Sequence, residues 1–350
     1  MGLAFGAKGV FMKPIVLSAP APRSLDLIFS QAKREQLHET YEVIETTEDE
    51  LAALPFRLLK ETRYILGQPH ISDSVLAQMT KLKAILNVET NLINNMPYPT
   101  LFERGIHVLT TGAVFAKPVA ELGLGLALDL ARGITDADLA FRNGTEQWGG
   151  DSNVNARMLG GSDIGIVGYG DLGRALRRVL QGFDPVIRVY DPWLPPSMLQ
   201  EDGVIPTELN TVLTQSDTLF VVAAVTSENQ RFIDAKAFAK MRPGCHFILL
   251  SRAEIVDFDA MMDAVQSGHI LVASDVFPEE PLPTDHPVRK LKGFIRSAHR
   301  AGALNTAFQQ MGDIVLEDMA LMDRDLVPMR CKRAERETVQ RFRSKPVTQN

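Results

Sequence analysis

The sequence predicts an α/β protein built from two doubly wound parallel-sheet domains. With 350 residues, the chain is long enough for about two domains. Strand-like and helix-like segments alternate from about residue 13, which is typical of βαβ units and parallel sheets. A glycine-rich turn at residues 165–173 also follows an apolar run and precedes a helix-like segment, as in the first unit of a doubly wound sheet.

Short apolar runs in the first third of the chain predict the strands of the first domain, at residues 15–17, 64–66 and 84–86. Helical patterns at 25–39 and 75–81 lie between them. A long helical arm is expected at 119–143, before a glycine-rich break at 149–161.

A second βαβ series begins at Ile164. Its expected strands are 164–168, 186–191, 218–224, 245–250, 270–275 and 294–297. Its expected helices include 172–181, 235–241 and 257–267. An amphipathic helix at 306–325 follows the last strand. Six strands with a glycine turn after the first form a dinucleotide-binding arrangement.

Composition excludes several classes of protein. Hydrophobic residues make up 45% of the chain and its net charge is −6, which predicts a packed core and disfavours nucleic acid as the partner. No segment is expected to span a membrane, and residues 1–10 lack the apolar core of a signal peptide. The two cysteines, Cys245 and Cys331, form no disulfide or metal-ligand pattern, so we expect a cytoplasmic protein without a metal site.

The three glycines of the turn have separate expected roles. Gly168 allows a tight turn, Gly170 lets the backbone approach a pyrophosphate, and Gly173 lets the following helix pack on the strand. The helix begins near Asp171 and Leu172, where backbone N–H groups and the positive end of the helix dipole favour phosphates. A purely structural turn is the alternative.

An acid follows the second strand of this series. Asp191 lies 18 residues after the last glycine of the turn, where its carboxylate can accept hydrogen bonds from ribose hydroxyls. The same charge would repel a 2′-phosphate. The sequence therefore predicts NAD rather than NADP as the cofactor.

Ionisable groups follow three later strands, where ligands of doubly wound sheets bind. They are Arg252, the group from Asp275 to Glu280, and His299. An arginine can bind a carboxylate and polarise a neighbouring carbonyl, and a histidine can move the proton that accompanies hydride transfer. The alternatives are a surface ion pair for Arg252, a solvated loop for the acids and a structural role for His299.

The motifs together resemble the D-isomer-specific 2-hydroxyacid dehydrogenase family, over roughly residues 80–325. The resemblance rests on Arg104-Gly-Ile-His-Val108, Val119-Ala-Glu121, the glycine turn with Asp191, Ser251-Arg252, Asp275-Val-Phe-Pro-Glu-Glu280-Pro-Leu-Pro and His299-Arg-Ala-Gly302. It implies an enzyme that transfers a hydride between NAD and C2 of a small 2-hydroxy or 2-keto acid. Glu280–Pro281 argues against the related formate dehydrogenases.

The resemblance also implies roles for single residues. Arg252 would bind the substrate carboxylate and carbonyl, and His299 would be the acid/base. Glu280 would pair with His299, and Asp275 would hold the nicotinamide carboxamide. No metal is implied.

The resemblance further implies how the chain divides. Residues 119–305 would form a Rossmann NAD-binding domain that includes the arm at 119–150. Residues 12–118 and 306–330 would form a discontinuous flavodoxin-like substrate domain, with the active site in the cleft between the domains. Residues 1–11 and 331–350 would be flexible termini. A homodimer through the cofactor domain and its arm is expected.

One departure from the family concerns the expected substrate loop, Val88, Glu89 and Thr90, where members usually have glycines. A carboxylate at Glu89 would repel an acid substrate unless it is neutral or points away. Two alternatives therefore stay open: a dinucleotide-sensing or protein-binding module with little turnover, and a dehydrogenase of a non-carboxylate substrate such as phosphite.

Overall fold

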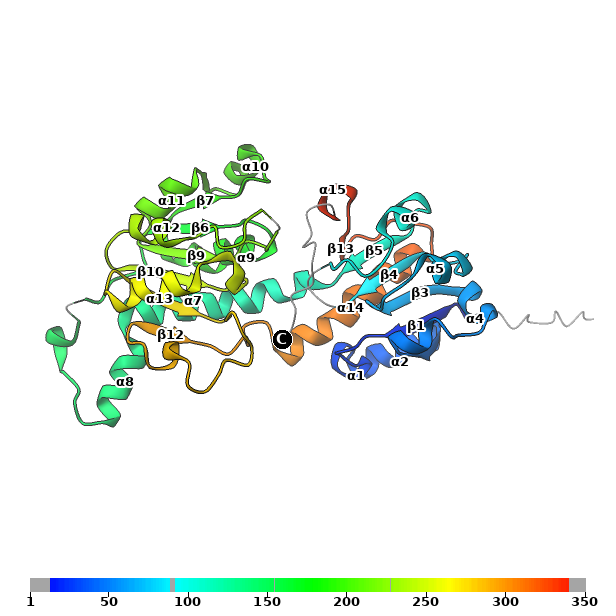
Figure 1. Ribbon diagram of the computed structural model, residues 1–350, viewed down its shortest axis with the longest axis horizontal. Coiled ribbons are helices and arrows are strands. Elements are labelled where there is room, and N and C mark those ends of the chain that lie inside the picture. The colour runs from blue at the N-terminus through cyan, green and yellow to red at the C-terminus, as the bar shows by residue number, and fades with distance from the viewer. Residues whose placement is uncertain (1–12, 89–91, 154, 227, 340–350) are drawn as a thin grey trace, which may run out of the picture. The chain divides into compact units, whose positions relative to one another are not determined.

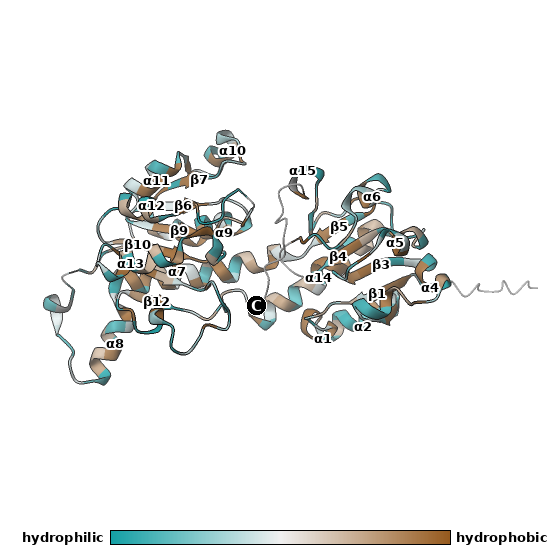
Figure 2. Ribbon diagram, in the orientation of Figure 1, coloured by the Kyte–Doolittle hydropathy of each residue, from teal (hydrophilic) through white to brown (hydrophobic). Residues whose placement is uncertain are grey.

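The computed structural model describes residues 13–88, 92–153, 155–226 and 228–339 (Figure 1). The chain divides into two compact units, the first made of Met1–Val114 and Phe308–Asn350 and the second of Phe115–Ala307. Each unit contains a predominantly parallel sheet, as the sequence predicts. The strands of both sheets are mostly apolar (Figure 2), because helices cover a parallel sheet on both faces.

Unit 1 contains a six-stranded sheet in the order β13-β5-β4-β3-β1-β2. Five strands are parallel and β13 is antiparallel to β5. Their bounds are β1 (Ile15–Ala19), β2 (Glu42–Glu45), β3 (Thr62–Gly67), β4 (Ala84–Asn87), β5 (His107–Thr110) and β13 (Lys332–Arg333). Since β2 and β3 lie on opposite sides of β1, the order of the sheet reverses at β1.

The helices of unit 1 connect these strands. They are α1 (Leu25–Ile28), α2 (Gln31–Thr40), α3 (Glu48–Leu51), α4 (Phe56–Glu61), α5 (Asp73–Gln78), α6 (Tyr98–Glu103), α14 (Asn305–Met322), whose first turn belongs to unit 2, and α15 (Arg336–Val339). The single helix expected at 25–39 is two helices. Phe29 is extended, and Ser30 begins α2 by accepting a hydrogen bond from the Lys33 N–H.

The chain after α14 differs from the flexible terminus expected at 331–350. Residues 331–339 include β13 and α15, and Cys331 is buried. The buried carboxylate of Asp318 accepts the backbone N–H groups of Met329, Arg330 and Cys331 at 2.7, 2.9 and 2.7 Å. These bonds fix the segment to α14. The expected flexible segments 1–11 and 340–350 lie outside the described residues.

Unit 2 contains a parallel sheet in the order β12-β11-β10-β9-β6-β7-β8. Its strands are β6 (Asp163–Val167), β7 (Val186–Tyr190), β8 (Ile205–Pro206), β9 (Thr218–Val221), β10 (Cys245–Leu249), β11 (Ile270–Ser274) and β12 (Phe294–Arg296). Six of them correspond to the expected strands, and β8 is additional. A two-residue edge strand is too short to produce an apolar pattern in the sequence.

The short helix η1 (Gly112–Phe115) lies at the end of the first segment of unit 1, and the helices of unit 2 begin with α7 (Ala116–Arg132), α8 (Ile134–Arg142) and η2 (Gly149–Asn153). They continue with α9 (Asp171–Leu180), η3 (Gln181–Phe183), α10 (Pro196–Glu201), α11 (Leu209–Gln215), α12 (Ala235–Lys240), η4 (Ala253–Ile255), α13 (Phe258–Gln266) and η5 (Pro287–Lys290). The helical arm expected at 119–143 is thus broken into α7 and α8 at Gly133, which has a φ of +61°.

Two further properties of the described residues bear on function. In the described part of the chain, every helix is too short or too polar to cross a bilayer. Over the same residues, no three or more histidine, cysteine, aspartate or glutamate side chains are grouped to hold a metal ion.

Candidate active site

The glycine turn lies where the strand order of unit 2 reverses, between β6 and β9. Gly168 follows β6 with a φ of +90°, and its N–H donates to the Tyr190 carbonyl at 2.9 Å. A Cβ atom on Gly168 would lie 2.5 Å from Cα of Ala223, which follows β9. Both the backbone conformation and this close approach require glycine.

The next two glycines differ in what surrounds them. A Cβ atom on Gly173 would lie 2.6 Å from the carbonyl oxygen of Gly168, so α9 packs directly on the turn. Beyond its neighbours in the chain, no heavy atom lies within 4 Å of the position that a Cβ of Gly170 would occupy. Gly170 precedes Asp171 and Leu172 and provides no side chain to cap α9. An open backbone at an uncapped helix N-terminus fits a pyrophosphate group.

Asp191 follows β7 beside this turn. Its carboxylate accepts hydrogen bonds from the N–H groups of Tyr169, at 2.7 Å, and Trp193, at 2.9 Å. Each carboxylate oxygen has a second lone pair that can accept a further bond. Asp191 therefore orders the turn and is positioned to accept ribose hydroxyls as well.

Glu280 and His299 form a hydrogen-bonded pair, with 2.5 Å between Glu280 Oε2 and His299 Nδ1. The other oxygen of Glu280 accepts the Phe277 N–H at 2.9 Å. Burial raises the pKa of Glu280, but the bonds from His299 and Phe277 and the positive charges of His299 and Arg252 outweigh it, so the pKa is lowered. Since Nδ1 is bonded to Glu280, Nε2 is the ring atom that can exchange a proton with a ligand.

Asp275, after β11, holds the backbone of His299. His299 has a φ of +46°, which is uncommon for a residue other than glycine. Its N–H donates to the Asp275 carbonyl at 2.7 Å. The N–H groups of Arg300 and Ala301 each donate to an Asp275 carboxylate oxygen at 3.0 Å. Asp275 is only 1% exposed. Its carboxylate therefore bonds to the backbone of the histidine loop instead of to water.

Arg252 lies after β10, at the same edge of the sheet, and its charge reaches Glu280. Its Nη1 donates to the Ser251 carbonyl at 2.7 Å. The buried Ser251 hydroxyl has no hydrogen-bond partner. The sequence signals for Ser251 are its place directly after an apolar strand and the Ser251-Arg252 motif of the family resemblance. An unpaired buried hydroxyl beside the glycine-turn edge of the sheet fits a polar cofactor group.

The expected substrate loop belongs to unit 1. Val88 follows β4 and is buried, and its carbonyl accepts a hydrogen bond from Arg23 Nε at 2.9 Å. Glu89 and Thr90 lie outside the described residues. The structure thus places Arg252, Asp275, Glu280 and His299 together in unit 2, on the same sheet edge as the glycine turn and Asp191.

Comparison with known proteins identifies the family. The family model for the NAD-binding domain of D-isomer specific 2-hydroxyacid dehydrogenases matches residues 124–301, about half of the chain. The chain belongs to this family. The match spans the glycine turn, Asp191, Arg252, Asp275, Glu280 and His299.

Individual members of the family are also similar to this chain. A glyoxylate reductase from Thermofilum pendens is 31% identical over 271 residues, which cover 74% of this chain and 77% of that protein. A D-3-phosphoglycerate dehydrogenase from Mycobacterium tuberculosis is 29% identical over 72% of this chain and 47% of its own length. A crystal structure of a phosphoglycerate oxidoreductase from Rhizobium etli shares 66% identity and a TM-score of 0.88, covering 93% of this chain and 99% of that one.

Family membership confirms the predicted fold, the predicted enzyme class and NAD as the cofactor. The protein is an oxidoreductase with NAD(P)-dependent 2-hydroxyacid dehydrogenase activity. The open backbone at Gly170, the carboxylate of Asp191 and the unpaired Ser251 hydroxyl all fit a bound dinucleotide.

Proposed function

We propose that this dehydrogenase prefers NAD to NADP and interconverts D-2-hydroxy acids and 2-keto acids, with His299 as the acid/base. The observation that carries the proposal is the contact of 2.5 Å between His299 Nδ1 and Glu280 Oε2. A histidine held by a carboxylate through one nitrogen presents the other nitrogen in a fixed orientation, which is what proton transfer in a dehydrogenase requires.

In the oxidative direction, the proton of the C2 hydroxyl moves to His299 Nε2 while the C2–H bond breaks. The electrons of the O–H bond form the carbonyl, and C2 loses hydrogen with its electron pair. NAD supplies the acceptor for that hydride when it is bound. In reduction, His299 returns the proton to the carbonyl oxygen.

Glu280 and Arg252 support this step in different ways. The Glu280 carboxylate fixes the ring of His299 through its bond to Nδ1. The planar guanidinium of Arg252 can bind the substrate carboxylate through two parallel hydrogen bonds and polarise the adjacent carbonyl.

We also propose roles for the two units. Unit 2 would be the NAD-binding domain, in which the turn from Gly168 to Gly173 holds the pyrophosphate and Asp191 the ribose. Unit 1 would be the substrate domain, with Val88, Glu89 and Thr90 as the substrate loop. The domain bounds expected from the sequence, 119–305 for the cofactor and 12–118 with 306–330 for the substrate, differ from those of the two units by a few residues at the crossings between them.

The first experiment measures NADH oxidation with glyoxylate, hydroxypyruvate and pyruvate. His299→Ala should lower kcat by about 10²–10⁴, the usual contribution of a general acid/base. His70→Ala, which removes an exposed histidine of unit 1, is the matched control and should leave kcat unchanged. An unchanged kcat in His299→Ala would exclude His299 from the chemistry.

The same assay separates the alternatives. NADH binding without turnover of any acid would favour a sensing module. Turnover that carboxylate competitors do not inhibit would favour a non-carboxylate substrate such as phosphite.

The preference for NAD is tested by comparing kcat/KM for NADH and NADPH. Asp191→Ser should shift the ratio toward NADPH by about tenfold or more, because it removes a charge that repels the 2′-phosphate. Glu201→Ser removes an exposed acid of α10, outside the glycine turn, and serves as the control. A wild-type ratio that favours NADPH would refute the assignment.

We further propose a homodimer formed through the helical arm. None of the side chains of α8 is buried. Phe141 is 62% exposed and Trp148, which lies 6.3 Å from it between ring centroids, is 77% exposed. Other exposed apolar side chains of this arm are Ile134 and Leu139. Such a patch indicates a protein–protein interface, and a second copy would cover it.

The two cysteines support a reducing compartment, and we propose the cytoplasm. Both thiols are free and buried. Burial raises the pKa of Cys245 to about 12, so this thiol stays protonated and unreactive.

A further inference from the structure

Trp193 is a half-exposed aromatic residue beside the proposed ribose site of unit 2. It follows Asp191 by two residues, after the end of β7, and is 48% exposed. Its backbone N–H donates to Asp191 Oδ1 at 2.9 Å, and Oδ2 of the same carboxylate accepts the Tyr169 N–H of the glycine turn at 2.7 Å. The backbone of Trp193 is therefore fixed beside the turn that would hold the pyrophosphate.

The bond to Asp191 determines which part of a dinucleotide lies near Trp193. The carboxylate of Asp191 is positioned to accept the hydroxyls of the adenosine ribose. In that ribose, C1′ carries the adenine and is bonded directly to C2′, which carries one of the hydroxyls. The residues that follow Asp191 are therefore within reach of the base.

The loop after β7 has few groups that can hydrogen-bond to the edge of a base. Residues 192–196 are Pro-Trp-Leu-Pro-Pro, without a charged side chain. The prolines have no N–H, and the N–H of Trp193 is bonded to Asp191. Besides it, the segment has two N–H donors, those of the Leu194 backbone and of the indole. The flat face of the indole, by contrast, can stack on any base.

The loop after β9 borders the glycine turn and is also apolar where it does so. A Cβ atom on Gly168 would lie 2.5 Å from Cα of Ala223. Further along this loop, Asn229 uses both ends of its amide locally: Oδ1 accepts the Thr226 N–H at 2.7 Å, and Nδ2 donates to the Ala224 carbonyl at 2.8 Å. The Asn229 amide thus orders its own loop, which leaves stacking as the stronger means of holding a base here.

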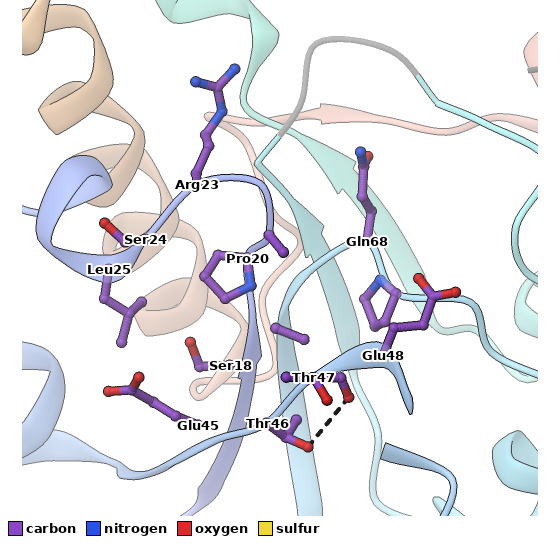
Figure 3. Close-up of a pocket in the computed structure, with 13 residues that line it drawn as sticks. Ser18, Pro20, Arg23, Ser24, Leu25, Glu45, Thr46, Thr47, Glu48 and Gln68 are labelled. Carbon is purple, nitrogen blue, oxygen red and sulfur yellow. Dashed lines mark hydrogen bonds between the residues drawn. The ribbon is translucent and has the colours of Figure 1, made fainter. Parts of the chain in front are cut away.

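Unit 1 has a pocket at a comparable place in its own sheet, but this pocket does not suit a stacked base. It has a volume of about 220 Å³ and lies at the carboxyl ends of β1, β2 and β3, where the strand order reverses at β1 (Figure 3). Among the described residues that line it, none is aromatic, and Glu45 and Glu48 contribute carboxylates. A flat base finds a stacking partner in unit 2 instead.

We propose that Trp193 stacks on the adenine of the bound dinucleotide, so that the protein recognises the base by its flat face and not by its edge. Trp193 is then a positioning residue for the cofactor, at the opposite end of the dinucleotide from the nicotinamide. The proposal rests on the role proposed for Asp191 in binding the ribose. It does not depend on His299 or on a particular substrate.

Fluorescence tests the contact directly, because the chain has two tryptophans. Trp148→Phe leaves Trp193 as the single indole. Titration of this variant with ADP-ribose should quench its emission, because a stacked base quenches an indole. Ribose 5-phosphate, which lacks the base, is the control and should not.

Two outcomes of this titration would overturn the proposal. ADP-ribose that binds in a calorimeter without changing the emission would place the base away from Trp193. Absence of ADP-ribose binding would also overturn it, since this probe retains the adenine, its ribose and the pyrophosphate.

Affinity provides a second test. Trp193→Ala should raise the Kd and the KM for NADH by about tenfold or more, the contribution of one stacked base, and kcat at saturating NADH should stay within about twofold. Trp193→Phe should restore most of the affinity, because a phenyl ring also stacks. Ile205→Ala, at a residue of β8 that is also 48% exposed, is the matched control. A wild-type Kd in Trp193→Ala, or a lower kcat without a change in Kd, would contradict stacking.

Recognition by the face also predicts tolerance of the base. The NADH analogue with hypoxanthine in place of adenine lacks the 6-amino group but keeps a flat purine. Its kcat/KM should lie within about twofold of that for NADH, whereas loss of a hydrogen bond to the amino group would lower it by up to about tenfold. A loss of that size would show recognition by the edge and refute the proposal.

Failure of the proposed function would be seen separately. A preference for NADPH would remove the role of Asp191, and an inert His299 would remove the proposed acid/base. Quenching of Trp193 by ADP-ribose would still place the adenine at Trp193 in either case, because it is measured without turnover.

Discussion

Asp275 acts on His299 through the backbone. Two N–H groups of the histidine loop donate to its carboxylate, and hydrogen bonds to a charged group contribute about 1.5–3 kcal/mol each. The positive φ of His299 is unfavourable by about 1–3 kcal/mol. The bonds to Asp275 are therefore sufficient to hold His299 in this conformation, with its ring against Glu280.

Replacing Asp275 tests this role. Asp275→Ala should lower kcat by about tenfold or more, because the ring of His299 loses its fixed position, and should leave the Kd for NADH within about twofold. The melting temperature should fall as well, since two buried N–H groups lose their acceptors. Glu279→Ala removes an exposed acid four residues away and serves as the control.

A different outcome would support the role implied by family resemblance. If Asp275 holds the nicotinamide carboxamide, Asp275→Asn should raise the Kd for NADH strongly. A large effect on Kd with little change in kcat would contradict positioning through the backbone.

The sequence predicted the roles of single residues best where a role depends only on elements that are adjacent in the chain. The roles of Gly168 and Gly173 follow from a strand, a turn and a helix adjacent in the chain. The contacts of Asp275 are made with residues 299–301, which lie 24 residues or more further along the chain. The spacing of residues in the sequence does not reveal such a contact. The pair of Glu280 and His299 came from family resemblance for the same reason.

At the scale of elements, most buried strands were predictable, although the buried strand β5 was missed, and the short polar strands were not. The core strands β10 and β11 lie within one residue of their expected bounds, because their apolar runs are continuous. β2, with the sequence Glu-Val-Ile-Glu, and the two-residue β8 were missed since neither has an extended apolar pattern. The break at Gly133 was missed because a single glycine is tolerated in many helices.

The glycine turn gives a prediction about an element. Gly168→Ala should destabilise the protein by about 2 kcal/mol or more, because the added Cβ is strained by the positive φ and meets Ala223. Gly170→Ala should fold with nearly wild-type stability, since its Cβ meets nothing, yet weaken NADH binding by about tenfold or more.

Thermal melting and NADH titration of both variants check this contrast. Gly182→Ala, at another position with open space around the added Cβ, is the control and should change neither quantity. Wild-type affinity in Gly170→Ala would show that the pyrophosphate does not approach this residue.

At the scale of the whole molecule, the chain enters unit 2 after Val114 and returns to unit 1 at Phe308, within α14. The apolar periodicity of residues 306–325 predicted the helix α14, but it did not indicate which domain the helix belongs to. Only the family resemblance implied that it belongs with the N-terminal part of the chain, since a discontinuous domain depends on contacts between distant segments. In the structure, Tyr64 on β3 donates to Asp323, just after α14, at 2.7 Å.

Quaternary structure is the prediction at this scale. Phe141→Asp should convert the proposed homodimer to a monomer, because it places a charge within the apolar surface of α8. Light scattering after size-exclusion chromatography at micromolar concentrations measures the change. Phe56→Asp, at an exposed phenylalanine of unit 1, is the control. A wild-type protein that elutes as a monomer would refute the dimer.

The strand β13 has a consequence for solubility. β5 would otherwise be an edge strand, whose unpaired N–H and C=O groups form a template on which another chain can add. β13 occupies that edge with Lys332 and Arg333, both exposed and both positively charged. Because β13 is two residues long and charged, it leaves little backbone for a further strand to pair with. The bonds from Asp318 that hold the preceding segment therefore also protect the sheet against aggregation.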